Sequence, residues 1–200
     1  MDESERRSRP KSTALSAGSL SDAACDVDDD PDPEPAAASE RLIVDISRQD
    51  GDWSKFDSLD MAIAEAARAV SAARELDFEP ALATVALSDD SRVRGLNAMY
   101  RHQDKPTNVL SFPAPKGTMS EIEDRAFLGD IVLAVETVAQ EAQDLGLPPV
   151  HHLQHLVVHG LLHLLGFDHE DAGEAEAMEA LETVLLARIG VADPYATADE

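Results

Sequence analysis

The chain has 200 residues, of which 44% are hydrophobic, and its formal net charge is -24. This length and composition are sufficient for one sizeable hydrophobic core. The single cysteine, Cys25, excludes a disulfide framework and a thiolate-rich zinc site. The negative charge argues against non-specific nucleic-acid binding, which needs an excess of lysine and arginine. Any nucleic-acid function must therefore depend on a local exception to the overall charge.

The first 39 residues are rich in Ser, Asp, Pro and Ala, as in "DVDDDPDPEPAAASE". They offer almost nothing to bury, so we predict an acidic, disordered tail over 1–39. The opening "MDESERRSRPKS" lacks the apolar region of a signal peptide, and no stretch approaches the apolar length of a membrane span. We therefore expect a cytoplasmic protein with no membrane partner, a folded domain over 40–195 and a flexible C-terminus over 196–200.

Hydrophobic patterning in the remaining sequence predicts four strands and five helices. Short runs rich in β-branched and apolar residues predict the strands 41–46, 81–88, 107–113 and 129–135. Apolar residues at helical spacing predict helices over 57–78, 89–101, 136–146 and 150–166 and from Asp171 onward, with a polar loop over 115–127. This order favours a single small α/β (α+β) domain, whose four-stranded mixed sheet is covered by helices, mostly on one face. The order of the strands stays open.

The stretch "HGLLHLLGFDH" spaces three histidines as H-x₃-H-x₅-H. His159 and His163 lie one helical turn apart on the same face of the expected helix. Gly166 predicts a left-handed end to that helix, after which the chain can turn back and bring His169 to the same face. Three imidazoles make an open zinc site, with a position left for water. We interpret the other histidines of this helix, His151, His152 and His155, as hydrogen-bonded core residues.

Two other interpretations of this metal site remain open. A purely structural zinc site would need a fourth protein ligand, for which Asp168 or Glu170 could serve. A metallopeptidase would normally carry a glutamate base after the first histidine, but the chain has Gly160 there, so the base would have to be Glu170 or Asp171. A phosphodiester needs instead a cation that stabilises charge on the phosphoryl oxygens, usually arginine or lysine.

Such cations are concentrated between residues 92 and 125, the one part of the expected domain with a basic excess. Its basic residues are Arg92, Arg94, Arg101, Lys105, Lys116 and Arg125. Any single one of them is most simply a solvated surface charge. Together, on a strongly acidic chain, they indicate a surface that faces phosphate.

Three stretches together resemble the YbeY endoribonuclease family, also described as the rRNA maturation factor family. They are "LNAMYRHQDKPTNVLSFP", "LGDIVL" and "HGLLHLLGFDHEDAGEAEAMEALE". The resemblance runs from about residue 41 to Tyr195 and excludes the acidic tail. It implies a small α/β domain with a four-stranded sheet covered by helices.

The resemblance also implies a single-strand-specific, metal-dependent endoribonuclease that acts in 16S rRNA 3′-end maturation and late-stage 70S ribosome quality control. Its metal ligands would be His159, His163 and His169, holding one Zn²⁺ per chain, and its catalytic residue would be Arg101. We expect Lys105 to help guide the RNA strand. The implied partners are single-stranded RNA, the 16S rRNA precursor, and ribosome or small-subunit proteins and assembly factors, with no DNA. A non-catalytic, zinc-containing ribosome-assembly factor and, less favoured, a metallopeptidase are the alternative functions.

Overall fold

The structure is a computed structural model that describes three stretches of the chain: residues 41–120, 125–169 and 171–196. All of them belong to one unit, which begins at Ser39. The predicted acidic tail over 1–39 lies outside the described residues, as does most of the predicted flexible C-terminus.

A four-stranded mixed sheet forms the centre of the unit, as predicted. Its strands are β1 (Leu42–Arg48), β2 (Ala81–Ser88), β3 (Val109–Pro113) and β4 (Ala126–Ala134). They are ordered β1-β2-β4-β3. The first three strands in this order run parallel, and β3 pairs antiparallel with β4 at one edge.

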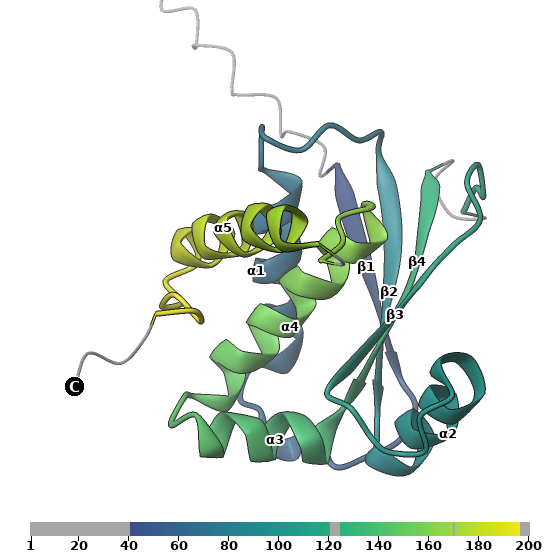
Figure 1. Cartoon of the computed structure of the whole chain (residues 1–200), viewed down its shortest axis with the longest axis vertical. Coiled ribbons are helices and arrows are strands. Elements are labelled where there is room, and N and C mark those ends of the chain that lie inside the picture. Colours follow the sequence, from purple (N-terminus) through teal and green to yellow (C-terminus); the bar gives the residue numbers. More distant parts are fainter. Residues whose placement is uncertain (1–40, 121–124, 170, 197–200) are drawn as a thin grey trace, which may run out of the picture. The chain divides into compact units, whose positions relative to one another are not determined.

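Five α-helices and one short 3₁₀ helix connect and cover the strands. They are η1 (Trp53–Lys55), α1 (Leu59–Ser71), α2 (Asp90–Arg101), α3 (Val135–Asp144), α4 (Pro149–Leu164) and α5 (Ala172–Arg188). Helix α2 lies on one side of the sheet, and the other four α-helices lie on the opposite side (Figure 1). The expectation that most helices share one face is therefore confirmed.

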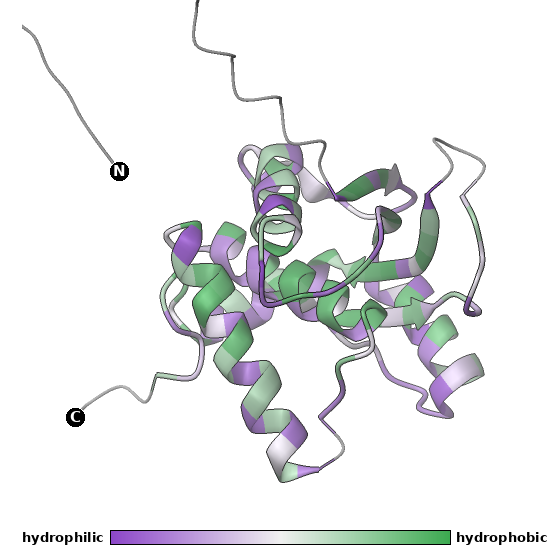
Figure 2. Cartoon of the chain, turned by 90° about the horizontal axis from the view of Figure 1, so that it is seen from above, coloured by the Kyte–Doolittle hydropathy of each residue, from purple (hydrophilic) through white to green (hydrophobic). Residues whose placement is uncertain are grey.

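The main hydrophobic core lies between the sheet and helices α1, α4 and α5. Ile63 of α1, Ile131 of β4, Leu161 of α4 and Leu185 of α5 are all fully buried in it. A smaller cluster, which includes Val93 of α2, fills the space between α2 and the other face of the sheet. In Figure 2 the green, hydrophobic segments gather at the centre of the fold. Helix α4 is thus fixed against the sheet, and its partly exposed face is the one that carries the histidine motif.

Helix α1 ends at Ser71, seven residues before the helical pattern of the sequence ends. The side chain of Arg41 donates hydrogen bonds to the carbonyls of Leu76 (3.1 Å) and Phe78 (2.8 Å). Its guanidinium also lies 4.2 Å from the centre of the Phe78 ring. Ala73 and Leu76 are buried in the main core, and Arg41 supplies hydrogen-bond donors to the loop, so this segment is stable without continuing the helix.

Strand β4 begins at Ala126, so the predicted polar loop ends earlier than expected. The pairing of β2 with β4 shifts register beside Gly129, whose φ is +135°. A Cβ atom at Gly129 would lie 2.2 Å from the carbonyl oxygen of Phe112 on β3. The register shift interrupts the alternation of apolar and polar residues on which the strand prediction relied. The absence of a side chain at Gly129 lets β3 approach β4 closely.

Candidate metal centre and adjoining cleft

Helix α4 ends in a turn that explains the spacing of the last histidine. The Gly166 amide bonds the carbonyl of His163 (3.0 Å), and the Phe167 amide bonds the carbonyl of Leu162 (3.0 Å). These two bonds form a Schellman motif, in which Gly166 has a positive φ of +96°. The left-handed end of the helix predicted at Gly166 is therefore confirmed. The chain turns back at this point, and His169 returns to the histidine face of α4.

The three predicted ligands, His159, His163 and His169, come together. Each offers a ligand atom within 4.8 Å of the others, an arrangement consistent with a metal site. The Nε2 atoms of His159 and His163 are 3.1 Å apart. The ring of His169 lies 5.8 Å from that of His159 and 5.0 Å from that of His163, measured between centroids.

The hydrogen bonds of these rings fix which nitrogen is free. His163 Nδ1 lies 3.0 Å from the carbonyl oxygen of Phe167, which can only accept, so Nδ1 carries the proton. His159 Nδ1 lies 2.8 Å from a carboxylate oxygen of Glu182 and donates in the same way. In the neutral rings both Nε2 lone pairs therefore face each other. Two opposed lone pairs are favourable when a cation lies between them, so the donor set fits a metal ion.

Burial favours the neutral ligand form of His163. It lowers the pKa of this imidazole, and the neighbouring His159 lowers it further, while the bond to the Phe167 carbonyl acts in the opposite direction. Neutral imidazole is the form that binds a metal. His163 is therefore in its ligand state at a pH where an exposed histidine is still partly protonated.

The carboxylate behind His159 belongs to Glu182 of α5, which is fully buried. Besides His159, it accepts hydrogen bonds from His155 Nε2 (3.0 Å) and from the hydroxyl of Tyr195. Burial alone would raise the pKa of Glu182, but the bonds from His155, His159 and Tyr195 outweigh it and lower the pKa to about 2. Tyr195 responds in the opposite direction, because burial and the adjacent Glu182 raise its pKa.

Glu182 and Tyr195 were not predicted as site residues. A signal for Glu182 was present: it lies four residues after Met178, on the same buried stripe of α5 that carries Leu185 and Leu186. A carboxylate at such a position needs hydrogen-bond donors, because a buried, unpaired charge is very costly. Nothing in the sequence indicates that two histidines of α4 supply those donors.

Gly160, which replaces the glutamate of the peptidase motif, is buried where α4 contacts the sheet. A Cβ atom there would lie 2.9 Å from Cδ1 and 3.0 Å from Cγ2 of Ile131. A glutamate at this position would have to displace the side chain of Ile131 or push α4 away from β4. Close packing of the helix on the sheet therefore leaves no room for the peptidase base.

The remaining acidic candidates of the peptidase and structural-zinc interpretations have other partners or lie outside the structure. The carboxylate of Asp171 accepts hydrogen bonds from the amides of Gly173 and Glu174 (2.9 Å each) and so caps α5. Asp168 accepts the amide of His169 (2.8 Å). Glu170 lies outside the described residues.

Arg101 and Lys105 line the same cleft as the three histidines. The cleft has a volume of about 820 Å³, and β3, the end of α2 and the turn after α4 also contribute to it. Both cationic side chains are exposed, and among the residues that the structure describes no carboxylate forms an ion pair with either. The cleft thus places two cations from the region of basic excess beside the histidine site.

Two side chains of α2 fix the loop that carries Lys105. Arg94 binds both carboxylate oxygens of Asp104, at 2.6 and 2.9 Å, so it is not available to phosphate. The buried Asn97 donates to the carbonyl of Lys105 at 2.8 Å. Of the six basic residues predicted for a phosphate-facing surface, only Arg101 and Lys105 line the cleft.

The comparisons with known proteins agree with this geometry. A family model described as "Endoribonuclease YbeY" matches residues 46–190. A protein of that name from Azorhizobium caulinodans is 48% identical over 157 residues, which cover 76% of this chain and 96% of the relative. Another, from Rhodopseudomonas palustris, is 50% identical over 149 residues, which cover 74% and 86%. A solution structure from Thermotoga maritima is 23% identical and covers 78% of this chain and 100% of that one, with a TM-score of 0.43.

The chain belongs to the YbeY endoribonuclease family. The resemblance seen in the sequence is therefore confirmed, and with it the assignment to the hydrolases that cleave RNA. The YbeY match includes every residue of the histidine motif and also Arg101 and Lys105. Among the described residues, no helix is long and apolar enough to cross a membrane.

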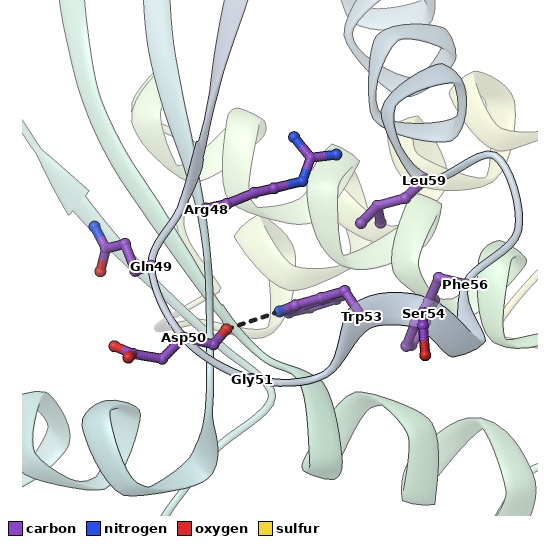
Figure 3. A pocket seen from close by; sticks show the side chains of 8 residues that line it. All are labelled: Arg48, Gln49, Asp50, Gly51, Trp53, Ser54, Phe56 and Leu59. Carbon is purple, nitrogen blue, oxygen red and sulfur yellow. Dashed lines mark hydrogen bonds between the residues drawn. The ribbon is translucent and has the colours of Figure 1, made fainter.

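A second pocket lies apart from this YbeY motif and carries none of the predicted site residues. It has a volume of about 440 Å³ and lies where β1, η1 and the start of α1 meet (Figure 3). Arg48 forms an ion pair with Asp60, and the Trp53 indole donates to the carbonyl of Asp50 at 3.2 Å. No histidine lines it, so the histidine cleft remains the candidate site.

Proposed function

We propose that this protein is a single-strand-specific, metal-dependent endoribonuclease with one zinc ion held by His159, His163 and His169. The observation that carries the proposal is the shared cleft: three convergent imidazoles and two cationic side chains line one cavity. When bound, the zinc ion supplies Lewis-acid polarisation of the phosphate and makes hydroxide available near neutral pH.

The residues of the chain have separate tasks in this mechanism. Arg101 binds the scissile phosphate and stabilises the negative charge that builds on its oxygens in the transition state. Lys105 binds a neighbouring phosphate and orients the strand, because a flexible ammonium acts as a point charge without bidentate geometry. The Phe167 carbonyl and the Glu182 carboxylate hold the Nδ1 protons of His163 and His159.

RNA is a better substrate for this cleft than a peptide. Peptide hydrolysis needs a group that protonates a poor amine leaving group, and the position for that base is closed by the packing of Gly160 on Ile131. Phosphodiester cleavage depends instead on stabilising phosphoryl charge, which Arg101 can do. The metallopeptidase alternative therefore has no support among the described residues.

The biological substrate that fits this proposal is the 16S rRNA precursor at its 3′ end, with a further role in late-stage 70S quality control. The support is membership of the YbeY family and the need for a partner that presents RNA to a strongly acidic protein. Ribosomal or small-subunit proteins and assembly factors would supply that presentation in the cytoplasm.

A cleavage assay on one defined RNA oligonucleotide tests the proposed function. The same labelled RNA is presented as a single strand and annealed to its complement, with a DNA strand of the same sequence as a further substrate. We expect cleavage of the single-stranded RNA alone, loss of cleavage when a chelator removes the metal, and its return when Zn²⁺ is added. Casein in a parallel reaction should stay intact.

The His163→Ala protein, purified by the same protocol, controls for contaminating nucleases. Equal cleavage by wild type and His163→Ala, with casein intact, would favour the non-catalytic assembly factor. Analysis of the new ends also identifies the attacking group, because a 2′,3′-cyclic phosphate would exclude direct attack by water and indicate the ribose 2′-hydroxyl.

A further inference from the structure

We propose that Glu182 is a positioning residue of the metal centre, which fixes His159 in the tautomer that presents Nε2 to the metal. This inference rests on the proposed metal site at His159, His163 and His169. It assigns a role to a side chain of α5 that would contact neither the metal nor the RNA.

The geometry of His159 gives the first argument. Its Nδ1 lies 2.8 Å from Glu182 Oε1, and its Nε2 lies 3.1 Å from His163 Nε2. A carboxylate accepts and does not donate, so the proton of the neutral ring stays on Nδ1 and the Nε2 lone pair points to the metal position. Without an acceptor at Nδ1, the ring could carry its proton on Nε2 and lose its function as a ligand.

The burial of Glu182 gives the second argument. Its side chain is 0% exposed, and its second oxygen accepts from His155 and Tyr195. With three donors around it, the carboxylate cannot move without breaking its other bonds. It therefore holds the ring of His159 at a fixed angle and places a full negative charge one imidazole away from the cation, where it offsets positive charge.

His163 differs from His159 in the nature of its Nδ1 partner. That partner is the carbonyl of Phe167, which is fixed by the turn at Gly166. A carbonyl orients the ring but carries no net charge. Of the two Nδ1 partners, Glu182 is thus the one that carries a negative charge. Its removal should weaken metal binding more than the loss of its packing contacts alone would.

An alternative is that a metal ion binds directly to Glu182. His155, His159 and Glu182 also offer three ligand atoms within 4.8 Å of one another, so they could themselves hold a metal ion. In that arrangement His159 would bind through Nδ1, with Glu182 as a direct ligand. The two contacts, 2.8 and 3.0 Å, have hydrogen-bond length, and the Tyr195 hydroxyl also donates to Glu182, so the carboxylate already has a full set of donors, which favours the positioning role.

The test compares Glu182→Gln with Glu179→Gln, the same substitution on an exposed residue of the same helix. Zinc affinity is measured on the metal-free proteins by competition with a chromophoric chelator, and the stability of each metal-free protein by thermal unfolding. We expect Glu182→Gln to bind zinc about 10–100-fold more weakly, as is typical for loss of such a partner, and Glu179→Gln to match wild type. Unchanged zinc affinity in a destabilised Glu182→Gln would show a structural role only and overturn the proposal.

Long-range ¹H–¹⁵N spectra of zinc-loaded wild type give a second measurement that does not depend on how the variants fold. We expect a protonated Nδ1 and a metal-bound Nε2 for His159. A metal-bound Nδ1 would overturn the proposal and place the ion against Glu182. Neither readout uses RNA, so absence of cleavage with correct zinc binding would contradict only the proposed function, and absence of zinc binding by wild type would contradict both.

Discussion

The two sides of the cleft are built in different ways. On the histidine side, His159 and His163 are partly buried, and their Nδ1 atoms have fixed acceptors in Glu182 and the Phe167 carbonyl. On the cationic side, the side chains of Arg101, at the end of α2, and Lys105, in the loop that follows, are exposed. Arg94 and Asn97 hold this loop, through Asp104 and the carbonyl of Lys105.

This difference matches what each side would bind under the proposed function. A metal ion requires ligand atoms at about 2.0–2.1 Å, so its ligands must be held before it arrives. A single-stranded RNA presents phosphates in many conformations, which long, solvated side chains can follow. We therefore expect substitutions on the histidine side to abolish function and substitutions on the cationic side to reduce it by degrees.

The largest effect is expected for His163→Ala. Loss of one of three ligands should remove zinc, and with it several kcal/mol of transition-state stabilisation, or on the order of 10³-fold in cleavage rate. Metal content by mass spectrometry and single-turnover cleavage of a defined RNA measure both quantities. A variant that loses zinc but retains cleavage would break the link between the metal and the chemistry.

An intermediate effect is expected for Arg101→Ala. Removal of one preorganised group that stabilises phosphoryl charge should lower the cleavage rate about 10²–10³-fold, with zinc content unchanged. Arg92→Ala is the matched control, because it removes the same charge from the same helix at an exposed position that does not line the cleft. Equal rates for the two variants would remove Arg101 from the mechanism.

The smallest effect is expected for Lys105→Ala. Its loss should weaken RNA binding several-fold without changing the rate at saturating RNA, and should reduce the slope of log affinity against log salt by about 0.7. Binding of a short RNA to wild type and variant, measured over a series of salt concentrations, tests this. An unchanged slope would mean that Lys105 does not neutralise a phosphate.

Much of this comparison could be predicted from local sequence patterns. The histidine spacing and Gly166 predicted the convergence of three candidate metal ligands and the turn, because both depend on residues within one or two helical turns. The alternation of strands and helices predicted the four-stranded sheet. Both are local properties, and the structure confirms the turn and the sheet.

What could not be predicted depends on contacts between distant segments. The order β1-β2-β4-β3 follows from pairing across the whole domain. The role of Glu182 depends on the packing of α5 on α4, because Glu182 lies 23 residues after His159 in the sequence. The closure of the peptidase position depends on the approach of Gly160 to Ile131, which no periodicity in the sequence indicates.

A crystal structure of the zinc-loaded protein with a bound phosphate group, from a non-cleavable single-stranded RNA, tests the central claim most directly. We predict one anomalous zinc peak bound by Nε2 of His159 and His163 and by His169, with the phosphate between the zinc and the guanidinium of Arg101. Zinc bound elsewhere, or a phosphate held away from Arg101 beside a correctly bound zinc, would contradict it.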